Sequence, residues 1–307
     1  MGATIVISKL LMGGRRICHS KKVAPYLFIM PFVLSFLLFF LYPLLSTINM
    51  SFQEIFPGET RYIGLANYEK IWNPHFYRAV YNTSLYTLGT LIILIPVPLL
   101  LAILLNRKET PGRQFFRSAL FIPALTSVVV AGVVFRLMFG VSDTSLINSL
   151  LIKLGLSPQQ WTMHAETGMF LMLLLATWRW TGVNLLYFLA GLQNIPKELY
   201  QSADIDGAGP LQKFWHITLP MLKPVVIYVL TISIFGGFRM FEESYVFWGT
   251  ASPGDIGLTI TGYLYQQGFE SFDLGLGAAI GVVLLLIVLT INLIQLRFFG
   301  LFSKEDE

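Results

Sequence analysis

The sequence is poor in charge, in cysteine and in nucleotide-binding motifs. Only 12% of its 307 residues are charged, which is about half of the roughly 25% found in soluble domains. Its single cysteine, Cys18, excludes an internal disulfide framework and a metal site built from several cysteines. The pattern G-x-x-x-x-G-K-S/T does not occur, so the chain has no phosphate-binding loop with which to hydrolyse ATP.

Patterns typical of enzymes are missing as well. The four histidines (His19, His75, His164 and His216) are isolated, and none has a partner at metal-ligand spacing. We therefore predict that the chain is not an enzyme and that it binds no metal or cofactor itself. The net charge of +4 comes from lysines and arginines dispersed over several loops, so we do not expect nucleic acid as a partner.

Long apolar runs dominate the sequence. Hydrophobic residues make up 55% of the chain, and the mean hydropathy is +0.66. Because a spanning helix needs about 20 apolar residues, we predict an all-α membrane protein with six transmembrane helices, over residues 25–48, 80–105, 118–139, 168–190, 224–247 and 274–297. Residues 24–300 would form the transmembrane domain, between a leader of residues 1–23 and a tail of residues 301–307. The first run is too long for a cleavable signal peptide, so we expect a retained anchor in the lipid bilayer.

The distribution of lysine and arginine predicts which loops are cytoplasmic. Fourteen of these residues lie in the leader, in the loops at 106–117 and 191–223, and from Arg297 onward, against four in the loops on the other side. Positive residues accumulate on the cytoplasmic side of a membrane. We therefore expect both termini to be cytoplasmic.

A polar stretch, ELYQSADIDGAGPLQKFWHITLP, interrupts the apolar sequence at residues 198–220. It lies in the loop at 191–223, and its punctuation predicts two short helices joined by a turn. Asn194 is expected to cap the first helix, Gly207 to supply a positive φ in the turn, and Pro210 to open the second helix. The spacing of the second helix predicts an aromatic ridge made of Leu211, Phe214, Trp215 and Thr218. Such a ridge either lies at the headgroups or enters a groove on a partner protein.

The spacing within this stretch resembles the EAA loop of ABC-importer permeases. In that motif Glu-Ala-Ala is followed after three residues by Gly, and after nine more by Ile-x-Leu-Pro. The matching positions are Gln201, Ser202, Ala203, Gly207, Ile217, Leu219 and Pro220. Two further segments, NPHFYRAVYNTSLYT at 73–87 and SALFIPALTS at 118–127, are similar to carbohydrate-type permeases of the maltose class. The resemblance covers the chain from about residue 24 to residue 299.

The resemblance implies the type I permease fold of ABC importers, in a bacterial cell membrane. The chain would be the membrane-spanning subunit that translocates a sugar, and we expect a neutral oligosaccharide. The implied partners are a second related permease, two copies of a cytoplasmic ATPase that uses ATP and Mg, and an extracytoplasmic solute-binding protein. The loops at 50–78 and 140–167 would receive that binding protein.

The coupling loop at 191–223 would dock on the ATPase through its polar stretch. Its candidate contact residues are Glu198, Gln201, Ser202, Ala203, Asp206, Gly207, Phe214, Ile217, Leu219 and Pro220. Gln201 replaces the glutamate of the motif, and Ser202 replaces its first alanine. The ionic contact that this glutamate makes in the motif would be made here by Glu198, Asp204 or Asp206, or by a second permease that keeps the full motif.

Ionisable and aromatic residues in the predicted fourth and fifth spans form the candidate sugar site. They are Trp178, Trp180, Asn184, Arg239, Phe241, Glu242, Glu243 and Tyr245. Aromatic faces suit the C–H surfaces of a sugar, while carboxylates and amides suit its hydroxyls. The permeases that the chain resembles hold substrate between the equivalent spans. The charges have a structural alternative, in which Arg239 or Arg179 pairs with Glu242 or Glu243.

Two classes of function follow. The first is the sugar-importer subunit, and the second is an ion-coupled secondary transporter in which Glu242 and Glu243 are the coupling carboxylates. A secondary transporter would be expected to show internal repeats and more than six spans. The sequence has no obvious repeated half, and this favours the importer.

Overall fold

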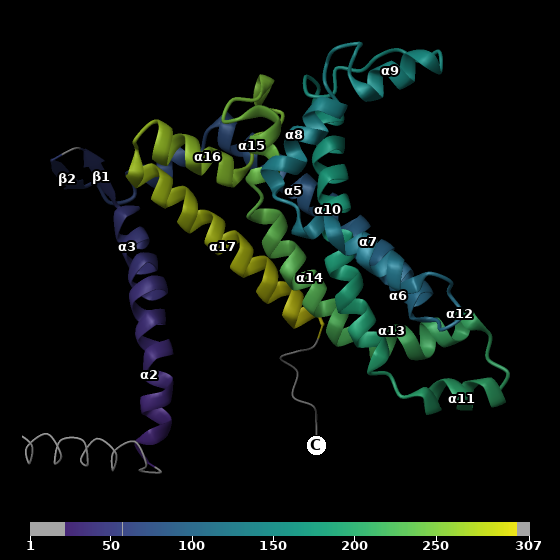
Figure 1. The fold of residues 1–307 in the computed structure, drawn as a ribbon. Coiled ribbons are helices and arrows are strands. Elements are labelled where there is room, and N and C mark those ends of the chain that lie inside the picture. Colours follow the sequence, from purple (N-terminus) through teal and green to yellow (C-terminus); the bar gives the residue numbers. More distant parts are fainter. Residues whose placement is uncertain (1–21, 57, 300–307) are drawn as a thin grey trace, which may run out of the picture.

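The computed structural model describes residues 22–56 and 58–299, which form a helical bundle from which the first long helix stands apart along most of its length (Figure 1). Five helical stretches among these residues are long and apolar enough to cross a membrane, and a bent pair brings the number to six. The fold class predicted from the sequence is therefore confirmed. The leader up to residue 21 and the tail at 301–307 lie outside the described residues.

The spanning segments are built from the following helices. They are α2 (Ala24–Phe36) with η1 (Leu37–Leu41) and α3 (Tyr42–Met50); α5 (Pro74–Leu94) with α6 (Pro96–Asn106); the bent pair α7 (Arg113–Leu125) and α8 (Val128–Met138); α10 (Ala165–Gln193); α14 (Lys223–Phe238) with α15 (Glu242–Trp248); and α17 (Leu274–Phe298).

Short elements connect these helices at both ends of the bundle. One end carries a hairpin of β1 (Gln53–Phe56) and β2 (Glu59–Tyr62), α4 (Ala66–Ile71), α9 (Leu146–Lys153), η3 (Pro253–Asp255), α16 (Ile260–Tyr265) and η4 (Gln266–Glu270). The other end carries α11 (Lys197–Ile205), α12 (Pro210–Lys213), η2 (Phe214–Thr218) and α13 (Leu219–Met221). The predicted coupling loop and the predicted outer loops thus lie at opposite ends.

The first spanning segment touches the bundle at one end alone. Its α3 part packs on α17, whereas none of the α2 residues is buried by the described part of the chain (Figure 1). Phe28, for example, is 79% exposed. A helix that is apolar on all sides is stable in lipid or against another chain. The sequence of α2 is apolar in this way.

The third and fifth predicted spans are each broken by residues with non-helical backbone angles. The third, predicted at 118–139, is two helices that meet at 97°, because Thr126 and Ser127 have extended ψ values of 134° and 133°. Pro123 precedes this break and has no N–H for a helical hydrogen bond. The fifth breaks between Phe238 and Glu242.

The long helix α10 lies at the centre and packs against α5, α6, α7 and α14. Its contact with α7 depends on Gly182, since a Cβ there would lie 2.0 Å from the carbonyl oxygen of Leu120. Small residues allow this close backbone approach in membrane bundles. The bundle that results positions α5, α10 and α14 around a common space.

Candidate functional site

The predicted coupling loop folds as two helical segments joined by a tight turn. Gly207 has φ +73°, which confirms the positive angle expected there. The N–H of Ala208 donates to Ala203 O at 2.8 Å, and that of Gly207 to Asp204 O at 3.1 Å, the two bonds of a Schellman cap. A Cβ on Gly207 would meet no described atom within 4 Å. Glycine is therefore required by the backbone angle and not by space.

The start of the first helix differs from the prediction. Asn194 does not cap α11, because it ends α10 and donates its N–H to Gly191 O at 3.1 Å. The helix begins at Lys197, and Pro196 occupies the N-cap position with an extended ψ of 131°. Proline has no N–H and keeps the preceding residue out of the helical region. The helix therefore starts after it.

The prediction of an aromatic ridge on the second helix is wrong. Leu211 and Trp215 are exposed, but Phe214 packs on the core and Thr218 is buried. The π turn η2 changes the angular spacing of these side chains, so i, i+3 and i+4 no longer share one face. The exposed apolar tip of the loop is made instead by Ile205, Leu211 and Trp215.

An ion pair between the two helical segments limits which carboxylates can contact the partner ATPase. Lys213 of α12 pairs with Asp204 of α11, so Asp204 is engaged within the loop. Glu198 and Asp206 are exposed and form no ion pair with another described residue. Of the three carboxylates considered as substitutes for the missing glutamate at Gln201, these two remain available.

The remaining candidate coupling residues differ in exposure. Gln201, Ser202 and Pro220 are exposed, whereas Ala203, Ile217 and Leu219 are half-buried. Tyr200 Oη lies 2.9 Å from Thr218 Oγ1 and holds α11 against η2. The half-buried residues thus fix the loop to the bundle, and the exposed ones face outward.

A cavity of about 600 Å³ lies among α5, α10, α14, α15 and α16. This volume falls within the range of about 300–1,000 Å³ typical of small-molecule sites. Six of the predicted sugar-site residues line it: Trp180, Asn184, Arg239, Phe241, Glu242 and Glu243. Two lie elsewhere. Trp178 packs against Phe135, with ring centroids 5.7 Å apart, and Tyr245 packs against Phe241 and Tyr265.

One charged pair is buried in the cavity wall. Arg179 Nη1 donates to Glu243 Oε1 at 3.2 Å, and both side chains are about nine-tenths buried. The guanidinium carbon lies 5.3 Å from the centre of the Trp180 ring. Arg179 Nε has no hydrogen-bond partner in the described part of the chain. Of the pairings left open by the sequence, this one is formed.

The other two charges lining the cavity are exposed to its interior. Arg239 and Glu242 make no ion pair with each other, although their positions differ by three, as on one face of a helix. The helix is broken between these residues, where Phe241 has φ −136°, and the break removes the helical spacing. The guanidinium of Arg239 instead lies 6.0 Å from the ring centre of Phe235. Two arginines and two glutamates thus leave the cavity wall with balanced charge.

Asn184 has a backbone partner as well as a place in the cavity wall. Its Nδ2 donates to Leu94 O at 2.9 Å. In a continuous helix that carbonyl would accept from the N–H of residue 98, but Pro98 has none. Asn184 therefore satisfies a carbonyl freed by proline, as neighbouring helices do in membrane proteins.

Sequence reasoning missed several residues of the cavity. They are Tyr86, Thr90, Tyr187, Ser233, Phe235 and Thr261. A usable signal existed on α5, where Thr83, Tyr86, Thr87 and Thr90 recur at helical spacing in an apolar span and are all buried. Polar residues on one face of a spanning helix indicate the side turned to protein or cavity.

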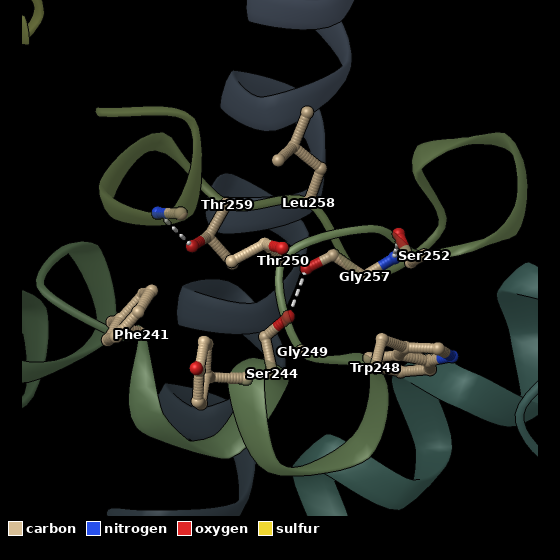
Figure 2. Close-up of a pocket in the computed structure, with 11 residues that line it drawn as sticks. Phe241, Ser244, Trp248, Gly249, Thr250, Ser252, Gly257, Leu258 and Thr259 are labelled. Carbon is tan, nitrogen blue, oxygen red and sulfur yellow. Dashed lines mark hydrogen bonds between the residues drawn. The ribbon is translucent and has the colours of Figure 1, made fainter. Parts of the chain in front are cut away.

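The loop after α15 contains a compact hydrogen-bonded turn (Figure 2). Ser244 donates to the carbonyl of Gly257, whose N–H donates to Ser252 Oγ at 3.0 Å. The ring of Trp248 closes the other side, where a Cβ on Gly257 would come within 2.3 Å. The space enclosed is about 10 Å³, enough for one water and too small for a sugar. The hydrogen-bonded turn therefore fixes α15, and with it Phe241, in the cavity wall.

The same loop is fastened to α5. Asn82 Nδ2 donates to Asp255 O at 2.8 Å and to Leu258 O at 2.9 Å. The N–H of Ile260 donates to Thr83 Oγ1 at 3.0 Å, and His75 Nδ1 lies 2.5 Å from Asp255 Oδ2. This end of the cavity is therefore braced between α5 and α16.

Known proteins resemble the chain over almost its whole length. It is 64% identical over 95% of its length to the arabinooligosaccharides transport system permease protein AraP of Bacillus subtilis (strain 168), covering 94% of that protein. The corresponding AraP of Halalkalibacterium halodurans is 56% identical over 94% of the chain and 92% of that protein.

A solved structure shares the fold. A chain of a bacterial ABC transporter involved in the import of the acidic polysaccharide alginate superposes with a TM-score of 0.82, at 22% identity, over 96% of this chain and all of that one. The family model for binding-protein-dependent transport system inner membrane components matches residues 77–305. The chain is therefore a multi-pass membrane protein that belongs to the family of binding-protein-dependent transport system inner membrane components.

Proposed function

We propose that this chain is the membrane-spanning subunit of an ATP-binding-cassette importer that carries a neutral oligosaccharide, delivered by an extracytoplasmic binding protein. The observation that carries the proposal is the cavity of about 600 Å³ within the bundle, lined by aromatic and polar side chains. Relatives at 64% and 56% identity are named as arabinooligosaccharide permeases, which supports a short pentose oligomer as the substrate.

The charge of the cavity supports an uncharged substrate. The arginines and glutamates that line it balance, and one arginine is already paired with Glu243. An anionic sugar placed between Arg239 and Glu242 would be attracted by the guanidinium and repelled by the carboxylate. A neutral sugar instead uses both as hydrogen-bonding groups, with the faces of Trp180 and Phe241 against its C–H surfaces.

The energy for transport comes from partner subunits in this proposal. The loop formed by α11, α12, η2 and α13 docks its exposed tip into a cytoplasmic ATPase, which binds ATP and Mg in two copies. A second, related permease completes the translocation pathway. The apolar surface of α2, which the described residues leave uncovered, faces lipid or that partner. The chain itself acts as a coupling and translocation subunit and has no enzymatic activity of its own.

The orientation follows from the same arrangement. The coupling loop lies in the cytoplasm, together with both termini, and the end that carries β1, β2, α9 and α16 faces outward to the binding protein. The lysine and arginine distribution of the sequence supports this orientation. Asn148 shapes the loop around α9, where it donates to Gly140 O at 3.2 Å and accepts from Trp161 Nε1 at 2.8 Å.

An ion-coupled secondary transporter finds no support. Glu243, one of its two coupling carboxylates, is engaged by Arg179 in a buried pair, and the family to which the chain belongs depends on binding proteins.

Affinity purification of the tagged chain from its native membrane in mild detergent tests the proposal. We expect an ABC ATPase and a second six-span permease to co-purify in stoichiometric amounts. Recovery of the chain alone, combined with uptake in liposomes driven by an ion gradient, would contradict the importer assignment.

A further inference from the structure

Four aromatic rings form a continuous cluster beside the cavity, at the end opposite the coupling loop. Tyr265 of α16 is its centre, with ring centroids 5.2 Å from Phe241, 6.1 Å from Tyr245 and 5.6 Å from Phe269. Phe241 and Tyr245 are themselves 5.1 Å apart. We call Phe241, Tyr245, Tyr265 and Phe269 the aromatic ladder. It joins two elements, α15 and α16–η4, that are separate in the sequence.

The backbone holds the far end of the ladder firmly. The N–H of Ser271 donates to Gln266 O at 2.8 Å, the bond of a π turn, and π turns are frequent at functional sites. The turn rests on α17 through two glycines, since a Cβ on Gly277 would lie 2.7 Å from Gly268 Cα. Phe269 stacks on Tyr265 with an interplanar angle of 27°. The rings are thus presented by a rigid support.

The ladder is open to a ligand along its length. Phe269 is 59% exposed and Tyr245 43% exposed, while Tyr265 and Phe241 are half-buried. Neither tyrosine hydroxyl is hydrogen-bonded to any residue that the structure describes. Stacked faces with free hydroxyls between them match a molecule that has both apolar C–H surfaces and hydroxyl groups.

The position of Phe241 connects the ladder to the cavity. Phe241 lines the cavity of about 600 Å³ together with Thr261 of α16, and the other three rings continue outward from it. We infer that the aromatic ladder is a second sugar subsite, at which a neutral oligosaccharide stacks its ring faces while it passes between the outer surface and the cavity. This inference rests on the proposed function and adds Tyr265 and Phe269 to its substrate-contacting residues.

The carboxylates and amides near the rings favour a sugar over lipid. Glu242 begins α15 beside Phe241, and Gln267 and Glu270 lie in the same π turn as Phe269. A lipid-facing patch would place ionised carboxylates against hydrocarbon at a high cost. Hydroxyl-rich ligands instead provide hydrogen-bond partners for them.

The experiment uses the complete transporter, with both permeases and the ATPase, in liposomes with loaded binding protein. Tyr265→Leu and Phe269→Leu remove a ring and keep an apolar side chain. Because an aromatic stacking contact contributes about 0.5–1.5 kcal/mol, we expect each to lower oligosaccharide uptake about 2- to 12-fold. Tyr265→Phe and Phe269→Trp keep a ring and should keep most of the uptake. Phe272→Leu is the matched control, because Phe272 is exposed in the same loop and belongs to no ring pair of the ladder.

A photo-crosslinking amino acid at position 269 gives a direct readout. During ATP-driven uptake of labelled oligosaccharide we expect covalent capture of the sugar at position 269 and none at position 272. Capture of the second permease or of lipid at position 269 in place of sugar would overturn the inference, as would leucine variants that transport like the Phe272→Leu control. In both cases the wild-type transporter would still import the sugar, so the proposed function would stand. A wild-type assembly that imports no oligosaccharide would instead refute the proposed function.

Discussion

Arg179 and Glu243 form a buried ion pair in the cavity wall, with Nη1 and Oε1 3.2 Å apart. The pair links α10 to α15, the second helix of the broken fifth span. It therefore holds the segment that carries Phe241 and Glu242 against the central helix. A single hydrogen bond between two buried charges makes each strongly dependent on the other.

Removing one member of this pair should destabilise the protein. We expect Glu243→Leu to cost about 3–5 kcal/mol, because it leaves the guanidinium of Arg179 buried without a counter-ion. The double variant Arg179→Met with Glu243→Leu should recover most of the loss. The thermal unfolding midpoint in detergent measures both. Glu242→Gln is the control for stability, since Glu242 is exposed to the cavity. A double variant no more stable than Glu243→Leu would show that the pair is not the cause.

The turn of the coupling loop should tolerate asparagine better than aspartate or β-branched residues at position 207. Gly207 has φ +73° with open space around it, and a non-glycine residue in that region costs about 1–2 kcal/mol. We expect Gly207→Val to lose the co-purifying ATPase, because a β-branched residue does not readily adopt the left-handed region. Gly207→Asp should reduce ATPase recovery, because it adds a negative charge next to Asp206, while Gly207→Asn adopts the same region without that charge and should keep it. Immunoblotting of the ATPase, at matched levels of inserted permease, is the measurement. Equal ATPase recovery for all three variants would argue against a role for the turn in docking.

Asn184 and Pro98 should behave as an interacting pair. Asn184→Leu leaves Leu94 O buried without its donor, which costs about 1–3 kcal/mol. Pro98→Ala restores an N–H at the position from which a helix would donate to Leu94 O. We therefore expect Asn184→Leu to be less destabilising in a Pro98→Ala background, as measured by a double-mutant cycle of unfolding midpoints. Strict additivity of the two changes would mean that they act independently.

The crossing of α7 and α10 should not accept even a methyl group. A Cβ at Gly182 would lie 2.0 Å from the backbone oxygen of Leu120, and a backbone atom cannot move aside as a side chain does. We expect Gly182→Ala to reduce the yield of monodisperse protein in size-exclusion chromatography. Gly236→Ala, on α14 with no described atom within 4 Å of its Cβ, should fold normally. Similar yields for both variants would contradict this packing.

The sequence predicted the helical class and the turn at Gly207, because long apolar runs and a glycine after a helix have few structural alternatives. It could not locate the breaks in the third and fifth spans, since the apolar run continues through Thr126, and the charges at Arg239, Glu242 and Glu243 are also compatible with a continuous helix. The break at Arg239 also determines which arginine pairs with Glu243. A continuous helix would have brought Arg239 to Glu243, whereas the interrupted one leaves Glu243 to Arg179.

The candidate sugar site was predicted in part, and for a similar reason. Aromatic and charged residue types marked the correct two spans, but Trp178 lies against Phe135, away from the cavity. Each step along a helix turns the side chain by about 100°. Trp178 and Trp180 are two positions apart, so they face different sides of α10. The α5 wall of the cavity, with Tyr86 and Thr90, lies far from both spans in sequence and is recognised once the helices are packed.

The most direct test of the importer assignment is ATP-driven uptake by the purified transporter in liposomes, with its binding protein outside and ATP inside. The comparison is between a neutral arabinose oligomer and an anionic oligosaccharide of equal length. We predict accumulation of the neutral oligomer that requires both ATP and the binding protein, and little uptake of the anionic one. Uptake of the neutral oligomer without ATP, or none under any condition, would contradict the assignment of this chain as an oligosaccharide importer subunit.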